Sequence, residues 1–186
     1  MSDQIRIVAG SFKQRLIKTP KGSDTRPTSS KVREAIFSML LNDIPDAVVL
    51  DLFAGSGALS FEAISRGAKR AVLCDSGHKA IAAIKENIKA LNVSAQTQVL
   101  PFPWPKALLH LSQENQKFDV IFLDPPYALD VSPVLEKIFA YTLLAKHAII
   151  CVEHGQSFIV PDGLSVIKSK QYGQTGISFI TEDNFD

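Results

Sequence analysis

Short apolar runs alternate with longer amphipathic segments between residues 47 and 152, and this alternation constrains the fold more than any other feature. The runs cover residues 47–53, 71–74, 97–100, 120–123 and 148–152, and the segments cover residues 58–65, 78–91, 106–113 and 132–144. Each run is long enough for one strand, and each segment carries apolar residues at helical spacing. Strands separated by helices form βαβ units, so the chain is predicted to be α/β with a mostly parallel sheet.

The end of the chain departs from this alternation. Residues 164–172 and 177–181 are two strand-like stretches in direct succession, joined by the turn-like sequence of residues 173–176. Consecutive strands with a short turn pair antiparallel. We therefore predict a C-terminal antiparallel hairpin at the edge of the sheet, which completes a seven-stranded sheet.

The first 45 residues are predicted to form a basic extension on a core that spans residues 46–186, the two making a single domain. Residues 5–9 and 16–17 predict a short β-hairpin, and apolar residues at helical spacing after a cap at Thr28, Ser29 or Ser30 predict a helix. Residues 1–33 hold eight Lys or Arg against two Asp, whereas the remainder holds twelve basic and seventeen acidic residues. Such a basic arm suits a phosphate backbone, with a merely solvated terminus as the alternative.

Composition places the chain among ordinary globular proteins. Hydrophobic residues make up 46% and charged residues 21%, and no apolar run approaches the ~20 residues needed to span a bilayer. No secretory signal is visible, and Cys74 and Cys151 lie inside apolar runs, as buried free thiols do. We expect a cytoplasmic monomer without a membrane partner. The four histidines lack metal-ligand spacing, so no metal is expected.

The sequence Asp51-Leu-Phe-Ala-Gly-Ser-Gly57 predicts a nucleotide-cofactor loop between a strand that ends at Phe53 and a helix that begins near Ala58. Glycines let the backbone turn sharply and approach a ligand closely, while the helix N–H groups point at it. A further acid follows 18 residues after Gly57, where Rossmann-like units bind ribose hydroxyls. Ser60 stands where a dinucleotide fingerprint has its third glycine, which favours an adenosyl cofactor. The candidate cofactor-binding residues are Asp51, Phe53, Gly55, Gly57 and Asp75. The alternative is a tight strand–helix turn without a ligand.

A second motif, Asp124-Pro-Pro-Tyr127, follows the strand-like run 118–123. Proline fixes φ and removes N–H donors, so Asp124 and the Pro125 carbonyl are left to accept the protons of a planar amino group. Accepting those protons favours a pyramidal nitrogen whose lone pair is directed at a methyl group. Tyr127 is suited to stack on a base and hold it in line. The catalytic candidates are Asp124, Pro125 and Tyr127, against the alternative of a proline-rich turn with a helix-capping Asp.

These motifs resemble those of amino-methyltransferases and, more narrowly, the RsmD family. The matching segments are Arg6-Ile-Val-Ala-Gly10, Arg26-Pro-Thr28, Lys31-Val-Arg-Glu-Ala-Ile-Phe37, Asp51 to Leu59, Ser65-Arg-Gly-Ala68, Asp124-Pro-Pro-Tyr127 and Tyr172-Gly-Gln-Thr175. The resemblance implies a Rossmann-like class I methyltransferase fold. It also implies transfer of a methyl group from S-adenosylmethionine, leaving S-adenosylhomocysteine, to the exocyclic N2 of a guanosine in bacterial 16S ribosomal RNA, free or in an assembling small subunit.

The resemblance and the charge pattern together give a set of candidate RNA-binding residues in the extension. The set consists of Arg6, Lys13, Arg15, Arg26, Thr28, Lys31 and Arg33. DNA-base methylation, protein-glutamine methylation and a non-catalytic RNA-binding scaffold remain as alternatives. Glu153, which ends a strand near the expected active edge, is a further candidate for the site.

One departure from the family pattern concerns the cofactor. The family places an Asp that accepts from the adenine amino group after its third strand, whereas this chain has Leu100-Pro-Phe-Pro-Trp-Pro105. No carboxylate stands there, and Phe102 or Trp104 is the candidate to sandwich the adenine. Asp75 also replaces the more usual Glu. We expect weaker or differently organised cofactor binding.

Overall fold

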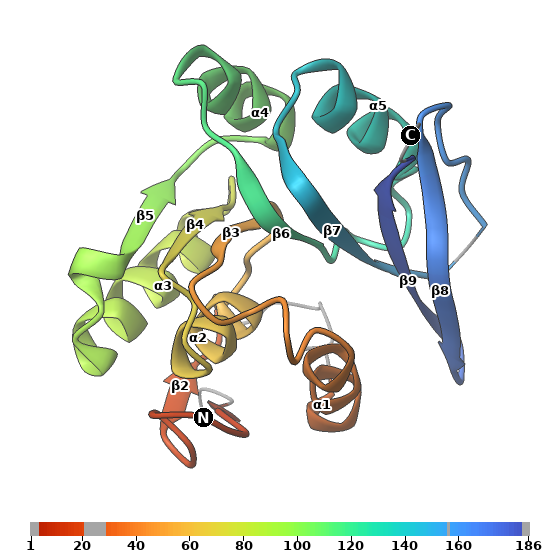
Figure 1. Cartoon of the computed structure of the whole chain (residues 1–186). Helices are drawn as coiled ribbons and strands as arrows, with labels where there is room; N and C mark the ends of the chain where they lie inside the picture. Colours follow the sequence, from red (N-terminus) through yellow and green to blue (C-terminus); the bar gives the residue numbers. More distant parts are fainter. Residues whose placement is uncertain (1–3, 21–28, 156, 184–186) are drawn as a thin grey trace.

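The computed structural model describes residues 4–20, 29–155 and 157–183. Within them, seven strands form one sheet in the order β5-β4-β3-β6-β7-β9-β8 (Figure 1). The strands are Val48–Asp51 (β3), Arg70–Cys74 (β4), Thr97–Leu100 (β5), Phe118–Leu123 (β6), Leu144–His154 (β7), Leu164–Tyr172 (β8) and Thr175–Glu182 (β9). Strands β3 to β7 are mutually parallel, and β9 runs antiparallel to both β7 and β8. The predicted Rossmann-like sheet with a C-terminal hairpin is confirmed.

Helices cover both faces of this sheet, as Figure 1 shows. Helices α1 (Ser30–Met39), α2 (Ala58–Ser65) and α3 (His78–Leu91) pack on one face. Helices α4 (Trp104–Gln113) and α5 (Ser132–Ala140) pack on the other, and a short 3-10 helix (Ser94–Gln96) precedes β5. Each face carries its own hydrophobic core because both sides of a parallel sheet must be buried. No helix in the described residues is long and apolar enough to cross a membrane.

The N-terminal hairpin is fastened to helix α2. Strands β1 (Gln4–Arg6) and β2 (Leu16–Lys18) pair antiparallel, and the side chains of Ile7 and Ile17 are buried in the same core as α2. The buried carboxylate of Glu62 accepts the backbone N–H groups of Val8 at 2.8 Å and Ala9 at 3.0 Å, as well as Nε of Arg66 at 2.8 Å. The extension is thus held by the helix that follows the cofactor loop. The boundary at residue 45 stays a prediction.

Contact between the hairpin and α2 also explains why Gly10 is a glycine. Its φ is +80°, and a Cβ at this position would lie 1.8 Å from the carbonyl oxygen of Ser65. The backbone N–H of Ser11 donates to that same oxygen at 2.7 Å, and the N–H of Phe12 donates to Ser65 Oγ at 2.9 Å. The segments around Gly10 and Ser65, which both belong to the family resemblance, therefore contact each other.

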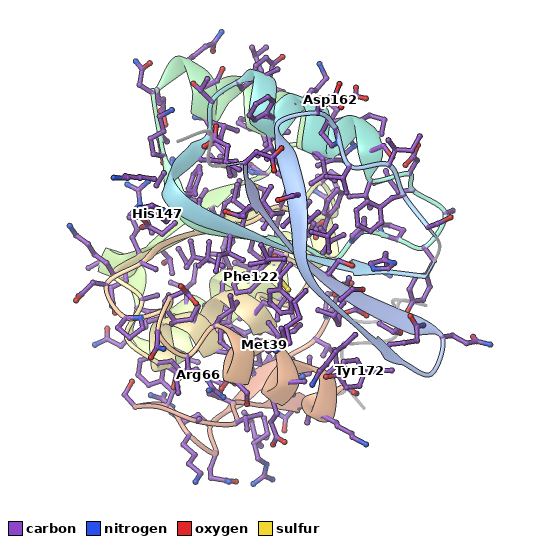
Figure 2. The ribbon with its side chains drawn as sticks, turned by 45° about the vertical axis from the view of Figure 1, so that its right-hand side comes forward. Met39, Arg66, Phe122, His147, Asp162 and Tyr172 are labelled. Carbon is purple, nitrogen blue, oxygen red and sulfur yellow. The ribbon has the colours of Figure 1, made fainter. Side chains whose placement is uncertain are left out.

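Helix α1 closes the core beside β6. Its N-cap is Ser29, whose hydroxyl accepts from the N–H of Val32 at 3.3 Å. Phe37 packs against Phe122 with ring centroids 5.6 Å apart. Figure 2 shows Phe122 at the middle of the molecule, with Met39 of α1 close to it in that view. Ser29 was one of the three predicted caps, and the predicted helix is confirmed.

Several predicted boundaries are wrong. The first strand ends at Arg6 and not at residue 9, and β7 spans Leu144–His154 where residues 148–152 were predicted. Strand β3 ends at Asp51, not at Phe53, because the chain turns at Leu52 while its N–H still donates to the Phe122 carbonyl at 3.2 Å. The segment predicted as one helix over residues 132–144 ends at Ala140. Thr142 takes a left-handed φ of 51°, and the N–H of Leu143 donates back to the Ile138 carbonyl at 3.2 Å, which ends the helix in time for β7 to begin.

Candidate active site

Carboxylates follow one another along the carboxyl edge of the parallel strands. In the order β4, β3, β6, β7 they are Asp75, Asp51, Asp124 and Glu153, and we call this row the acidic edge. Each stands two residues after a side chain of the core under α1–α3, namely Leu73, Val49, Phe122 and Cys151. Because side chains alternate along a strand, Asp51 in β3 and Glu153 in β7 belong to that face, and Asp75 and Asp124 follow one residue after β4 and β6 end. Ligands bind at this edge in open α/β sheets, at the switch point that β3 and β6 form here.

Asp51 is the most deeply buried of these acids, with 1% of its surface exposed. Its Oδ2 accepts from Ser60 Oγ at 2.9 Å, whereas its Oδ1 has no hydrogen-bond partner in the described part of the chain. Burial raises the pKa of Asp51 to about 7, the charges of Asp124 and Asp75 add to the rise, and the Ser60 hydrogen bonds oppose it. A buried acceptor without a donor is costly. The site therefore suits a ligand that brings an N–H donor and positive charge.

The two glycines of the cofactor loop, Gly55 and Gly57, differ in their surroundings. Gly57 has a φ of +80°, and a Cβ there would lie 2.5 Å from Cε2 of Phe61 and 2.9 Å from Cδ2 of Leu73, so it allows α2 to begin in contact with β4. Gly55 has a φ of +54° and faces open space, since a Cβ there would meet nothing within 4 Å. The loop is thus packed against the core at Gly57 and open at Gly55, which leaves space for a ligand.

Asp75 joins the cofactor loop to the end of β4. Its Oδ2 accepts from the N–H of Gly55 at 2.8 Å, and its Oδ1 accepts from the N–H of Gly77 at 2.8 Å. A carboxylate has about four acceptor positions, so both oxygens keep capacity for ribose hydroxyls. Phe53, the other predicted cofactor residue, is half-buried against the core under α4 and α5.

Asn87 supports the cofactor loop, although the sequence interpretation passed over it. Its side chain is buried, donates to the carbonyl oxygens of Ser56 at 3.0 Å and Lys18 at 2.9 Å, and accepts from the N–H of Lys18 at 2.8 Å. A signal was present, because Asn87 stands among Ala83, Ile84 and Ile88 on the apolar face of α3. A buried amide on such a face indicates a specific polar partner.

The Asp124–Tyr127 loop leaves β6 beside the cofactor loop. Asp124 is half-buried, Pro125 is buried, and the ring of Tyr127 is 56% exposed. The Tyr127 hydroxyl lies 3.0 Å from Thr175 Oγ1, and the ring packs on Gly155, where a Cβ would lie 2.9 Å from Tyr127 Cδ1. The loop is therefore braced by the end of β7 and the start of β9.

A cavity of about 560 Å³ opens next to this loop. One wall is formed by residues 125–132, including Tyr127 and Leu129, and the other by Glu153 to Gly155 and by Ser157 to Ile159. The cavity is thus bordered by an exposed aromatic ring, a buried carboxylate and apolar side chains. This combination suits a planar, polar-edged group such as a nucleobase.

The predicted RNA-binding residues separate into three groups. Arg6, Lys13, Arg15 and Lys31 are exposed; Arg6 contacts Gln14 Oε1 at 2.6 Å, and Arg15 donates to the Ala90 carbonyl. Arg26 and Thr28 lie outside the described residues. Arg33 is only 2% exposed, and its guanidinium donates to the Arg6 carbonyl at 2.9 Å.

The placement of Arg33 corrects the prediction that it contacts RNA. Burial lowers its pKa, against the opposing influence of Glu62 and Glu34, and a phosphate does not reach a side chain at this depth. Arg33 instead anchors α1 to the N-terminal hairpin. RNA binding by the exposed cations stays a prediction.

The segment without the family's adenine-binding acid runs from the end of β5 into α4. Phe102 is half-buried, with Lys106 Nζ 4.3 Å from the centre of its ring and the His110 ring 5.8 Å away. Trp104 is half-buried against the core under α4 and α5. Contact of either ring with an adenine stays a prediction.

Comparison with known proteins identifies the family. A family model described as "Conserved hypothetical protein 95" matches residues 5–181. The chain belongs to this family. It is the RsmD family whose motifs the sequence resembles, so that prediction is confirmed.

Relatives of this RsmD-family chain match it over nearly their whole lengths. YlbH of Bacillus subtilis, described as a candidate rRNA methyltransferase, is 36% identical over 94% of this chain and 97% of its own. Ribosomal RNA small subunit methyltransferase D of Haemophilus influenzae is 30% identical over 91% of this chain and 90% of its own. The solved structure of yhhF from Escherichia coli, described as a candidate methyltransferase, has a TM-score of 0.86 at 31% identity, covering 97% of this chain and 99% of that one.

Proposed function

We propose that this chain transfers a methyl group from S-adenosylmethionine to the exocyclic N2 of a guanosine in bacterial small-subunit (16S) ribosomal RNA. The observation that carries the proposal is the adjacency of two loops. Asp51 pairs with Phe122 in the β3–β6 register, so the cofactor loop and the Asp124–Tyr127 loop leave neighbouring strands at the switch point. A methyl donor in the first loop and an amino group in the second would lie next to each other.

The residues on the cofactor side fit S-adenosylmethionine. Asp51 Oδ1 offers a buried acceptor for the amino group of its methionine part, Gly55 leaves space for close approach, and Asp75 offers acceptors for the ribose. The acidic edge as a whole favours a ligand with a positive sulfonium and a positive amino group. S-adenosylmethionine supplies an electrophilic methyl group on sulfur.

The residues on the substrate side prepare the amino group. Asp124 accepts one N2–H and the Pro125 carbonyl accepts the other, so the N2 lone pair is freed from the ring. Tyr127 stacks on the base and fixes its approach. When bound, S-adenosylmethionine would supply the methyl group and keep the electron pair of its carbon–sulfur bond, while N2 would form the new bond to carbon and give one proton to Asp124, which would pass it to solvent. Such proton acceptance contributes typically about 10²–10⁴-fold to a rate.

The RNA would be held outside the acidic edge by the exposed cations of the extension, Arg6, Lys13, Arg15 and Lys31. Arg26 belongs to the same proposed surface. One chain supplies every part of the site, which supports a monomer, and a cytoplasmic location goes with a ribosomal substrate. The names of its relatives, which describe ribosomal RNA methyltransferases, support RNA rather than DNA or protein as the substrate.

The test is transfer of labelled methyl groups to unmodified small-subunit ribosomal RNA, free and in subunits, followed by nucleoside analysis. Wild type should yield N2-methylguanosine, and Asp124→Ala should lower transfer at least about 100-fold while binding S-adenosylmethionine as wild type does. Asp162→Ala, which removes an exposed acid at the far end of β8 from Tyr172 (Figure 2), should leave transfer unchanged. Methylation of DNA or of a glutamine instead, or equal loss of transfer and cofactor binding in Asp124→Ala, would refute the proposal.

A further inference from the structure

Glu153 is a buried acid near the end of a hydrophobic strand, and the proposed methyl transfer does not use it. It is 8% exposed, follows the buried residues Cys151 and Val152, and lines the cavity beside Tyr127. Its place in the cavity wall puts it where a group bound beside Tyr127 would meet it.

The sheet register sets Glu153 beside Asp124. Leu123, the last residue of β6, pairs in parallel with Val152 of β7, so the residues that follow this pair are Asp124 and Glu153. Adjacent strands lie about 4.8 Å apart. Both carboxylates also act on the buried Cys151 thiol, whose pKa is raised chiefly by burial and further by Glu153 and then Asp124. The two acids are therefore neighbours at the carboxyl edge of the sheet.

Two neighbouring acceptors match the edge of guanine. In guanine, the ring atom N1 next to the 2-amino group carries a hydrogen, so N1 and N2 present adjacent donors. In adenine and cytosine, the ring nitrogen beside the amino group is an acceptor, which a carboxylate repels. A carboxylate can accept but not donate, so it discriminates between these edges.

We propose that Glu153 is a specificity-determining residue that accepts N1–H of the target guanine while Asp124 accepts N2–H. This rests on the proposed function, and it adds the reason why guanine is chosen over other bases that carry an amino group. Tyr127, held by Thr175 and Gly155, forms the face on which the base lies between these acceptors. A site built to bind a donor strongly rejects an analogue that lacks it.

The experiment uses 2-aminopurine, which keeps the 2-amino group but has an unprotonated N1. The full-length protein is given small-subunit ribosomal RNA that carries either guanine or 2-aminopurine at the nucleotide that the wild type methylates. We expect wild type to prefer guanine at least about 100-fold in kcat/KM. Glu153→Gln places an amide beside N1, which can donate to 2-aminopurine, so the preference should fall to about 10-fold or less. The preference is a ratio within one enzyme, so it does not depend on the active fraction.

Controls separate this proposal from the proposed function. Glu182→Gln removes an exposed acid at the opposite end of β9 and should keep the wild-type preference. If Glu153→Gln does not fold, Glu153→Asp, which keeps the charge but reaches less far, should slow guanine methylation and keep the preference. An unchanged preference in Glu153→Gln, or a wild type that accepts both bases equally, would overturn the role of Glu153 alone. A wild type that methylates no guanine N2 would overturn the proposed function itself.

Discussion

The buried carboxylate of Asp51 should make the stability of the protein depend on pH in a way that a single substitution removes. The pKa of Asp51 is raised by burial from 3.8 to about 7. Because the folded pKa lies above the unfolded one, the contribution of this group to stability is fully present below pH 3.8 and is lost as the pH rises through 7. The whole difference corresponds to roughly 4 kcal/mol at 1.36 kcal/mol per pH unit.

Asp51→Asn keeps the shape of the side chain but does not titrate. The variant should therefore be more stable than wild type at pH 8, and its advantage should grow by roughly 3 kcal/mol between pH 5 and pH 8. The free energy of unfolding is measured by denaturant titration at several pH values in this range. Asp162→Asn, which alters an exposed carboxylate, serves as the control and should follow the wild-type curve.

Asp51→Asn should also weaken the binding of S-adenosylmethionine, so it raises the stability of the protein at neutral pH while it lowers its affinity for the cofactor. Asp51 must be ionised to meet a positively charged amino group, so wild-type affinity for S-adenosylmethionine should rise with pH up to about 7. Loss of a charge-assisted hydrogen bond costs about 1.5–3 kcal/mol, so Asp51→Asn should bind at least about 10-fold more weakly. Calorimetry measures both effects. Parallel stability curves for wild type and variant, or undiminished binding by the variant, would refute the reasoning.

Other contacts give further expectations. Gly57→Ala should lower the free energy of unfolding by more than about 2 kcal/mol, because the new Cβ meets the ring of Phe61. Gly55→Ala faces open space and should lower it by only about 1–2 kcal/mol, because its φ is positive. Urea unfolding of the two variants measures both costs. Glu62→Gln places an amide N–H group against the backbone N–H groups of Val8 and Ala9, so it should lower the free energy of unfolding by about 1–3 kcal/mol at unchanged m-value. A loss below about 0.5 kcal/mol would show that these hydrogen bonds contribute little to holding the hairpin. Asn87→Ala should weaken S-adenosylmethionine binding several-fold by releasing the cofactor loop, and calorimetry showing unchanged affinity would contradict that role.

Much of the sheet could be predicted because its signals are local. The strands at 97–100 and 164–172 and the helices at 58–65 and 78–91 have the predicted bounds. In these places the apolar periodicity and a neighbouring turn residue, such as Gly57, indicate the same boundary. The end of α5 shows the limit. Leu143 and Leu144 continue the apolar pattern, and only the left-handed backbone of Thr142, a residue type that does not signal it, ends the helix.

The parts of the candidate site could be predicted, but their arrangement could not. Motif spacing indicates Asp51 and Asp124 as candidates, while their adjacency depends on the strand order. Charge counting includes Arg33 in the predicted RNA-binding surface, although side chains two positions apart on a helix point in very different directions. Lys31 is exposed and Arg33 is buried. Long-range contacts decide which charges of a basic segment reach solvent.

The distribution of charge has a consequence for substrate choice. The carboxyl edge of the sheet bears Asp75, Asp51, Asp124 and Glu153, whereas the basic residues concentrate in the N-terminal extension. Phosphates are repelled by the first surface and attracted by the second. Under the proposed function, an RNA strand held by the extension would therefore enter the site only with a group that offers N–H donors. An unstacked base meets this condition at little cost, whereas a paired base must first be extruded for a few kcal/mol. The same acids that favour a cationic methyl donor thus favour a base with an exposed amino edge.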